Sequence, residues 1–374
     1  MRVPDRLRVG ITRYQPGVDD PEELSAWWAA TFGALWLDAE RNAWLYEKNP
    51  CIGEDGPGPW LCRRDGKIVG QQAEIPFEAK VGTQLRRAVW AVELQVDEAW
   101  RLRGVGPGLL ATLVDQRAIV CTIDISDEGQ VLLRRAGFAD LGIVPTYRRP
   151  LHARRALEMT GAPRLARRLG PILVPLLGAA DALAGVAVRA TGTHLVPVER
   201  LDSRIDEVWA AASAHYPVLA RRDLATLAWC IDERPDRHRL LRYYLVRRGR
   251  TLGYVVLRPT TSSGERSVVV VDYLAPPRWV APMLLAVGRR VRRDGVVAMS
   301  VKTLNQRVDR MLHAVGFVRR TLGHDDRRRM MVHCTAESDV CTLLSDRDSW
   351  LVTSTDCNLE FVGSDPGLET SNSD

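Results

Sequence analysis

The sequence predicts an α/β protein made of two tandem copies of one unit, each a twisted mixed sheet flanked by helices. A strand-like run at 88–96 leads through a Gly-rich turn into an apolar helical run at 109–118. Short hairpin patterns occur at 61–71 and again at 246–253. An acidic strand residue precedes a Gly-Phe pair by 44 residues in both halves, from Glu93 to Gly137 and from Asp272 to Gly316. Three elements that recur in order and at matched spacing indicate an internal repeat.

The Gly-rich turn, residues 101–108, is the most informative segment. It reads Arg-Leu-Arg-Gly-Val-Gly-Pro-Gly and lies where a strand passes into a helix. Backbone N–H groups converge at such a junction, and the helix dipole adds partial positive charge, so the segment is suited to hold an anion. The pattern lacks the Lys-Ser/Thr of a Walker loop, and a Gly-rich segment can also be only a turn.

The context of this turn carries a family resemblance. Upstream, the segment 61–71 predicts a hairpin with an Asp-Gly turn, and downstream a helix at 131–136 ends in Gly137-Phe138. The order of hairpin, long strand, Gly-rich turn, helix, strand, helix and Gly-Phe resembles the GNAT (Gcn5-related) acyl-CoA N-acyltransferase superfamily over residues 8–150. The tandem layout is similar to bacterial members associated with polysaccharide and cell-envelope biosynthesis.

The resemblance implies an acyltransferase that moves an acetyl or other acyl group from acyl-CoA to a small-molecule amine, with an amino sugar or envelope precursor as the suggested acceptor. Acetyl-CoA or another acyl-CoA is the implied co-substrate, and no metal is expected. The predicted donors to the pyrophosphate are the backbone N–H groups of Leu102, Arg103, Gly104, Val105, Gly106 and Gly108, with added charge from Arg101 or Arg103.

The resemblance also assigns roles on the strand. A backbone N–H at Leu94 or Val96 would face the thioester carbonyl, and Glu93 is the candidate base that accepts the amine proton. The alternative for Glu93 is an ordinary charge on the solvent face of a strand. The tyrosine that usually protonates the leaving thiolate in this family is replaced by Leu133, and in the second copy by Leu312. Tyr147 is a suggested substitute.

The second copy departs further from the family. Its segment 275–282 has no Gly-x-Gly, and its prolines remove backbone donors, so this copy is not expected to bind CoA. Two other functions remain open for the chain. One is a catalytically weak acyl-CoA-binding or scaffold protein, favoured by Leu133. The other is a Fem-like aminoacyl transferase, disfavoured by the intact first turn. Glu93 favours the enzyme.

The predicted organisation is an N-terminal acyl-CoA-binding domain at 1–150, a helical connector at 151–193, a degenerate domain at 194–361 and a disordered tail at 362–374. The connector begins with Arg154, Arg155, Arg164, Arg167 and Arg168 and continues as an apolar stretch to 188. We expect it to pack between the domains. Peripheral membrane contact through 154–188 is an alternative, whereas Asp181 and several Pro and Gly residues disfavour a span.

Composition narrows the function classes. The 374 residues are 46% hydrophobic and 26% charged with a net charge of +6, which suits an anionic ligand. No nucleic-acid recognition motif is evident. Seven cysteines, an odd number without Cys-x-x-Cys, argue against a disulfide framework and for the cytoplasm. Aromatic residues near the N-terminus (Trp27, Trp28, Trp36, Trp44 and Tyr46), and His215, Tyr216 and Trp229, either fill the core or line a cleft.

Overall fold

The computed structural model describes residues 9–15, 17–32, 39–53, 58–152, 186, 190–262, 264–320 and 328–358. The connector arginines, most of its apolar stretch, Trp36 and the tail lie outside these residues, so the structure does not test the expectations for them. Among the described helices, none is both long and apolar enough to cross a bilayer.

The first sheet has strands in the order β1-β2-β3-β4-β5-β15-β6, with β9 beside β3 and β16 beside β9. Its strands are β1 (Ile11–Arg13), β2 (Trp60–Arg64), β3 (Lys67–Val81), β4 (Gln84–Val96), β5 (Ile119–Thr122), β6 (Ala139–Ile143), β9 (Val218–Ala220), β15 (Arg329–Cys334) and β16 (Trp350–Leu351). The helices of this half are α1 (Pro21–Phe32), α2 (Ala39–Tyr46), α3 (Val105–Gln116) and α4 (Asp127–Arg135). A short 3-10 helix, η3 (Glu98–Trp100), joins β4 to the Gly-rich turn.

The second sheet has the order β14-β7-β13-β12-β11-β10-β8. Its strands are β7 (Thr146–Pro150), β8 (Thr193–Val198), β10 (Leu241–Arg247), β11 (Arg250–Ser262), β12 (Glu265–Leu274), β13 (Ala298–Lys302) and β14 (Val318–Arg320). The remaining helices are α8 (Arg204–Ala212), α9 (Leu224–Leu227), α10 (Pro277–Arg293), α11 (Gln306–Ala314) and α12 (Ser338–Ser345). Parallel and antiparallel pairs occur in both sheets, so the predicted α/β class with two mixed sheets is confirmed.

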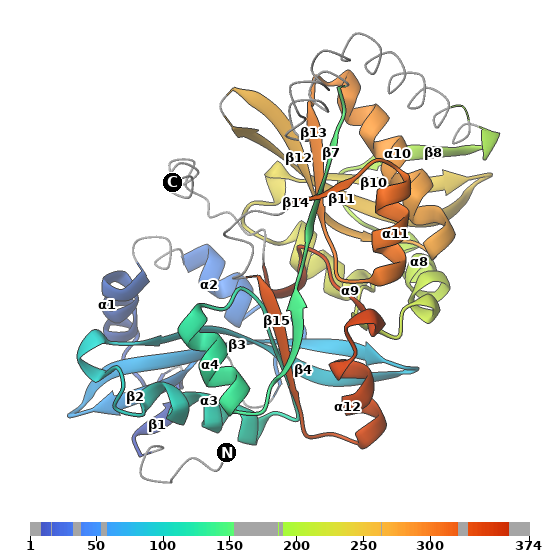
Figure 1. Ribbon diagram of the computed structural model, residues 1–374. Helices are drawn as coiled ribbons and strands as arrows, with labels where there is room; N and C mark the ends of the chain where they lie inside the picture. The colour runs from blue at the N-terminus through green and yellow to red at the C-terminus, as the bar shows by residue number, and fades with distance from the viewer. Residues whose placement is uncertain are drawn as a thin grey trace, which may run out of the picture.

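The two halves exchange a strand. β7, the last strand of the first copy in sequence, pairs with β13 and β14 of the second sheet, whereas β15 from the second half lies between β5 and β6 of the first. Figure 1 shows green β7 leaving the lower sheet for the upper one while orange-red β15 enters the lower sheet. Each sheet is therefore completed by the other half of the chain. Local sequence patterns do not specify this choice of partner, because the partners lie far apart in the chain and are brought together only by the packing of the whole fold.

The local elements follow their sequence signals. Two residues form the turn of each hairpin, and all four have positive φ. The φ values are 51° for Asp65 and 77° for Gly66 in the first hairpin, and 48° for Arg248 and 77° for Gly249 in the second. These positive angles belong to the tight turns that match strand twist, so both predicted hairpins are confirmed. Gly137 and Gly316, with φ of 90° and 86°, follow the ends of α4 and α11. A left-handed residue at this position ends a helix, as predicted.

A pair of tryptophans joins the two halves. The ring centroids of Trp44 and Trp229 are 5.4 Å apart in a stacked arrangement. Each indole N–H donates to the backbone carbonyl of the other tryptophan at 2.9 Å. Tyr216 is also buried and donates to the Ala275 carbonyl at 2.9 Å. Trp44 and Tyr216 are therefore core residues, whereas Trp229 is buried and also lines a small cavity of about 50 Å³.

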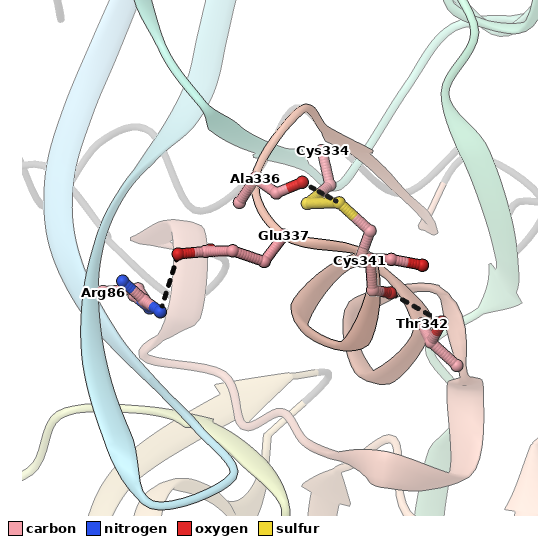
Figure 2. Close-up of a disulfide and its surroundings, with 7 residues drawn as sticks. Arg86, Cys334, Ala336, Glu337, Cys341 and Thr342 are labelled. Atoms are coloured by element: carbon pink, nitrogen blue, oxygen red, sulfur yellow. Dashed lines mark hydrogen bonds and ion pairs between the residues drawn. A yellow bond between two sulfur atoms is a disulfide. The ribbon is translucent and has the colours of Figure 1, made fainter.

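One cysteine pair departs from the expectation that the chain has no disulfide framework. Cys334 at the end of β15 is bonded to Cys341 in α12 (Figure 2). The same connection is flanked by an ion pair of 3.1 Å between Arg86 of β4 and Glu337. The odd count and the absence of Cys-x-x-Cys did not reveal this pair, because a strand-to-helix corner brings two cysteines seven residues apart into contact. The other five cysteines are free thiols.

Candidate active site

A β-bulge shapes the centre of β4. Val92 pairs with Ala73 and Gln95 pairs with Gln71, so that Glu93 and Leu94 together lie opposite the single residue Gln72. Glu93 has φ of 60°, which is rare for a residue with a side chain. Bulges increase local twist and redirect side chains, and here the bulge turns Glu93 toward a cavity.

The cavity lies where β4 and β5 separate. The two strands pair only at Val89 with Val120 and at Trp90 with Cys121, and they diverge beyond the bulge. The space has a volume of about 600 Å³, within the range of small-molecule sites. Its lining residues are Arg41, Leu45, Gln72, Ile75, Ala91, Val92, Glu93, Leu94, Gln95, Leu110, Thr122, Ile123, Asp124, Ile125, Ser126, Gly129, Leu133 and Cys357.

The Glu93 carboxylate is held by two partners from α2. Arg41 Nη2 lies 3.1 Å from Oε1, and the Tyr46 hydroxyl donates to Oε2 at 2.8 Å. Only 11% of the Glu93 side chain is exposed, so it does not lie on an open solvent face. Burial raises the pKa of Glu93, while the charge of Arg41 and the hydrogen bonds from Tyr46 and Arg41 lower it. The net effect is a carboxylate whose pKa lies above its usual value.

β4 also directs backbone N–H groups toward the gap between β4 and β5. The Asp97 N–H donates to the Val69 carbonyl at 2.9 Å, which fixes the alternation at the end of β4. Since N–H groups alternate between the two edges of a strand, the N–H groups of Val96 and Leu94 point away from β3. These are the donors expected from the sequence to face a thioester carbonyl.

The Gly-rich turn forms the N-terminus of α3. Gly104 is the N-cap with φ of 86°, and Leu102 has φ of 61° with a fully exposed side chain. The first N–H groups of a helix have no partner within it, which leaves those of Val105 and Gly106 available. The Gly108 N–H instead donates to the Gly104 carbonyl at 3.0 Å, so the structure removes it from the predicted donors. The Arg103 N–H is also engaged, with the Trp100 carbonyl at 3.4 Å.

The turn lies next to the cavity. A Cβ on Gly106 would lie 3.8 Å from Val96 and 3.9 Å from Leu132 of α4. Leu110, one helical turn after Gly106, lines the cavity. Arg101 Nε lies 3.4 Å from the Val96 carbonyl, at the mouth of the gap. Arg103 is over the Trp100 ring at 5.4 Å.

The cavity has no tyrosine at the position of Leu133, which is part of its apolar wall. The suggested substitute was wrong, because Tyr147 belongs to β7 in the second sheet. There, burial and a hydrogen bond to Asp309 raise its pKa. The sequence did not reveal that Cys357, from the C-terminal part of the chain, lines the cavity. Burial raises the pKa of Cys357 to about 12, so this thiol keeps its proton.

The second copy has a carboxylate at the matching position, beside a much smaller cavity. Asp272 accepts from the Tyr254 hydroxyl at 2.6 Å and lies 3.1 Å from Arg222 Nε, and it is completely buried. β12 and β13 are paired as far as Val270 and Val301, two residues before Asp272. α10 begins at Pro277, directly after β12, and no Gly-rich turn precedes it. Carboxylate, arginine and tyrosine therefore recur in both copies, but the cavity that Asp272 lines has a volume of only about 50 Å³, against about 600 Å³ for the cavity beside Glu93.

Searches of the sequence against family models and against curated proteins gave no match. Solved structures do match. A GCN5-related N-acetyltransferase from Anabaena variabilis ATCC 29413 superposes with a TM-score of 0.60 at 14% identity, over 90% of this chain and 75% of that one. The fold is that of the GNAT proteins.

Two further structures support this fold assignment. A probable N-acyltransferase from Enterococcus faecalis V583 has a TM-score of 0.59 at 14% identity, covering 87% of this chain and 72% of that one. N-myristoyltransferase from Saccharomyces cerevisiae with bound myristoyl-CoA has a TM-score of 0.50 at 10% identity, covering 87% and 82%. At these identities the likeness concerns the GNAT fold itself.

Proposed function

We propose that the protein is an acyl-CoA-dependent N-acyltransferase whose single reaction centre is the cavity beside Glu93. The observation that carries this proposal is the bulge of β4, which combines a gap between two strands with a buried carboxylate of raised pKa. The fold likeness adds support, since one similar structure holds an acyl-CoA.

The residues present fit an acyl-CoA. The free N–H groups of Leu102, Gly104, Val105 and Gly106 form an anion cradle at the mouth of the cavity. Arg101 adds a positive charge there. The gap between β4 and β5 would take the extended arm, because an extended chain can occupy the place of a missing strand neighbour. The N–H of Leu94 or Val96 would then polarise the thioester carbonyl.

In this reaction the amine nitrogen attacks the thioester carbonyl carbon. The new C–N bond forms, the amine proton passes to Glu93 directly or through a water, and the C–S bond breaks. Tyr46 and Arg41 hold the carboxylate in place for this step. Leu133, at the position of the usual tyrosine, has no proton to give. The leaving thiolate therefore takes its proton from solvent or from another group of the cavity wall.

The acceptor class is an amine-bearing small molecule. An amino sugar or an envelope precursor is the acceptor suggested by the resemblance to envelope-associated GNAT proteins. The aminoacyl-tRNA alternative is disfavoured by the cradle, which is suited to a pyrophosphate. The scaffold alternative is disfavoured by Glu93, since a protein that only binds CoA does not require a buried carboxylate in the gap.

The test is a screen of amines with acetyl-CoA, read as release of free thiol, in wild type and in Glu93→Gln. Glu93→Gln should lower turnover by about 10²- to 10⁴-fold, the usual contribution of a general base, and leave acetyl-CoA affinity nearly unaltered. Glu98→Gln is the matched control, because Glu98 is exposed in η3 and outside the cavity. Equal turnover in wild type and Glu93→Gln would remove Glu93 from the mechanism. Failure of wild type to bind any acyl-CoA would overturn the proposed function.

A further inference from the structure

A second hollow lies in the second half of the molecule, between the start of α10 and one face of α11. Its volume is about 630 Å³, comparable to that of the cavity beside Glu93. Its lining residues are His215, Pro276, Pro277, Arg278, Arg307, Arg310 and Met311. Three guanidinium groups and an imidazole line it, and no lining residue is acidic. The reaction centre proposed above makes no use of this hollow.

The basic character of the hollow is particular to the second copy. Gly316 follows Gly137 by 179 residues, and the same interval relates Arg307 to Glu128, Arg310 to Val131 and Met311 to Leu132. The first copy therefore has an acid and a valine where the second has two arginines. Positions 307, 310 and 311 share one face of α11, because residues three and four apart lie together on a helix.

The positive charge of the hollow is not neutralised within the described part of the chain. Arg278, Arg307 and Arg310 are all exposed, and no carboxylate there pairs with any of them. Arg310 donates only to the neutral amide of Gln306 at 3.0 Å. Arg278 lies 5.8 Å from the Trp279 ring centroid. The one acid in this part of α11, Asp309, is turned toward His313 at 3.2 Å.

We propose that this hollow binds a soluble small molecule carrying at least two phosphate groups, of the chemical class of a nucleoside diphosphate. Guanidinium groups match phosphate oxygens with paired hydrogen bonds, and three arginines around one hollow favour more than one phosphate. Pro277 has no N–H to offer, so side chains take the part that the backbone takes in the first copy. Pro276, Pro277 and Met311 provide an apolar floor for the uncharged part of the ligand.

The ligand of this hollow differs from the acyl donor. β12 and β13 are paired up to Val270 and Val301, and Asp272 beside them is fully buried. The residues that line the hollow lie outside β12 and β13, so the ligand lies on the surface with its phosphates toward α11. The proposal is therefore independent of acyl transfer at Glu93.

The experiment is calorimetric titration with inorganic pyrophosphate and, separately, ADP. The host is full-length Gly106→Glu, in which the first cradle is blocked by a carboxylate. Arg307→Gln with Arg310→Gln in this host removes two charges from the hollow. Arg292→Gln with Arg293→Gln removes the same charge from exposed positions at the far end of α10. Thermal melting checks that each variant is folded.

We expect one site per chain in Gly106→Glu and in the Arg292/Arg293 variant. The affinity should fall by about 10- to 100-fold for each arginine lost from the hollow, as for charge-assisted hydrogen bonds. If the Arg307/Arg310 and Arg292/Arg293 variants bind the probes with equal affinity, the arginines of the hollow contribute only through the net charge of the protein. That result would overturn the proposal. A host that binds neither probe would overturn it too. Cosedimentation with phosphatidylglycerol vesicles that needs Arg307 and Arg310, without binding of either probe, would assign the hollow to lipid headgroups instead.

Discussion

Tyr46→Phe is the sharpest test of how the structure sets the basicity of Glu93. The hydroxyl of Tyr46 donates to Glu93 Oε2 at 2.8 Å in a buried setting, and it stabilises the ionised form. Its own pKa is raised well above the usual value by burial and by the charge of Glu93, so it remains a donor at all relevant pH values. The substitution removes one oxygen atom and leaves the ring in place.

The direction of the change in the pKa of Glu93 depends on which protonation state of the carboxyl loses its hydrogen-bond donor. Without the donor, the ionised carboxylate is less stable and the protonated one is nearly unaffected, so the pKa of Glu93 rises. A hydrogen bond to a charged group contributes about 1.5–3 kcal/mol, and a tenfold change in proton affinity corresponds to about 1.4 kcal/mol. Proton affinity at Glu93 should therefore rise by about 10- to 100-fold.

The assay is ¹³C NMR of the glutamate side-chain carboxyls as a function of pH, which does not depend on knowing the acceptor. The Glu93 signal is the one absent from Glu93→Gln. With an acceptor, the acid limb of the pH–rate profile should move to higher pH, and turnover should recover at pH values well above the new pKa. Tyr273→Phe, at a buried tyrosine of the second sheet that donates to Thr303, is the control and should leave the Glu93 signal unchanged. An unchanged or lower pKa in Tyr46→Phe would refute the assigned role of Tyr46.

Three further outcomes are expected. Gly106→Glu should abolish acetyl-CoA binding in calorimetry, whereas Gly106→Ala should retain it because its Cβ would make only ordinary contacts at 3.8 Å; equal affinity in the two variants would exclude the turn as the cradle. Tyr254→Phe should lower the free energy of unfolding in urea by about 1.5–3 kcal/mol, since Asp272 loses a buried partner, and should not alter acetyl-CoA affinity. Residues 1–152 and 190–374 produced separately should each fail to show a cooperative thermal transition and should gain one when produced together; two independent cooperative transitions would contradict the strand exchange.

The sequence predicted those parts of the fold that depend on neighbours in the chain. Asp65-Gly66, Gly249 and both helix-ending glycines are residues that tolerate positive φ, and the matched 44-residue spacing indicated the repeat. The exchange of β7 and β15 was not predictable, because strand partners are chosen over long range. The same reason explains the error over Tyr147, which was expected near the first site because it follows Gly137 on the next strand, whereas the exchange places it in the second sheet.

The candidate site was predictable in a similar, partial way. The Gly-rich turn and Glu93 were identified from the order of elements, whereas Arg41 was not, because nothing local marks an arginine of α2 as the partner of a carboxylate 52 residues later. Cys357 gave no signal either, since it reaches the cavity from the other end of the chain. The disulfide was missed because an odd number of cysteines says nothing about any one pair. Cys334 and Cys341 meet because the chain turns between β15 and α12.

The exchanged strands also set an order of events during synthesis on the ribosome. β6 ends at Ile143, but its neighbour β15 begins only at Arg329, 186 residues later. At about 5–20 residues per second, this interval lasts roughly 10–40 s. Throughout that time the edges of β5 and β6 have no partner, and an unpaired edge is a template for aggregation. We therefore expect the nascent first half to need protection by a chaperone, or rapid elongation, until β15 has emerged.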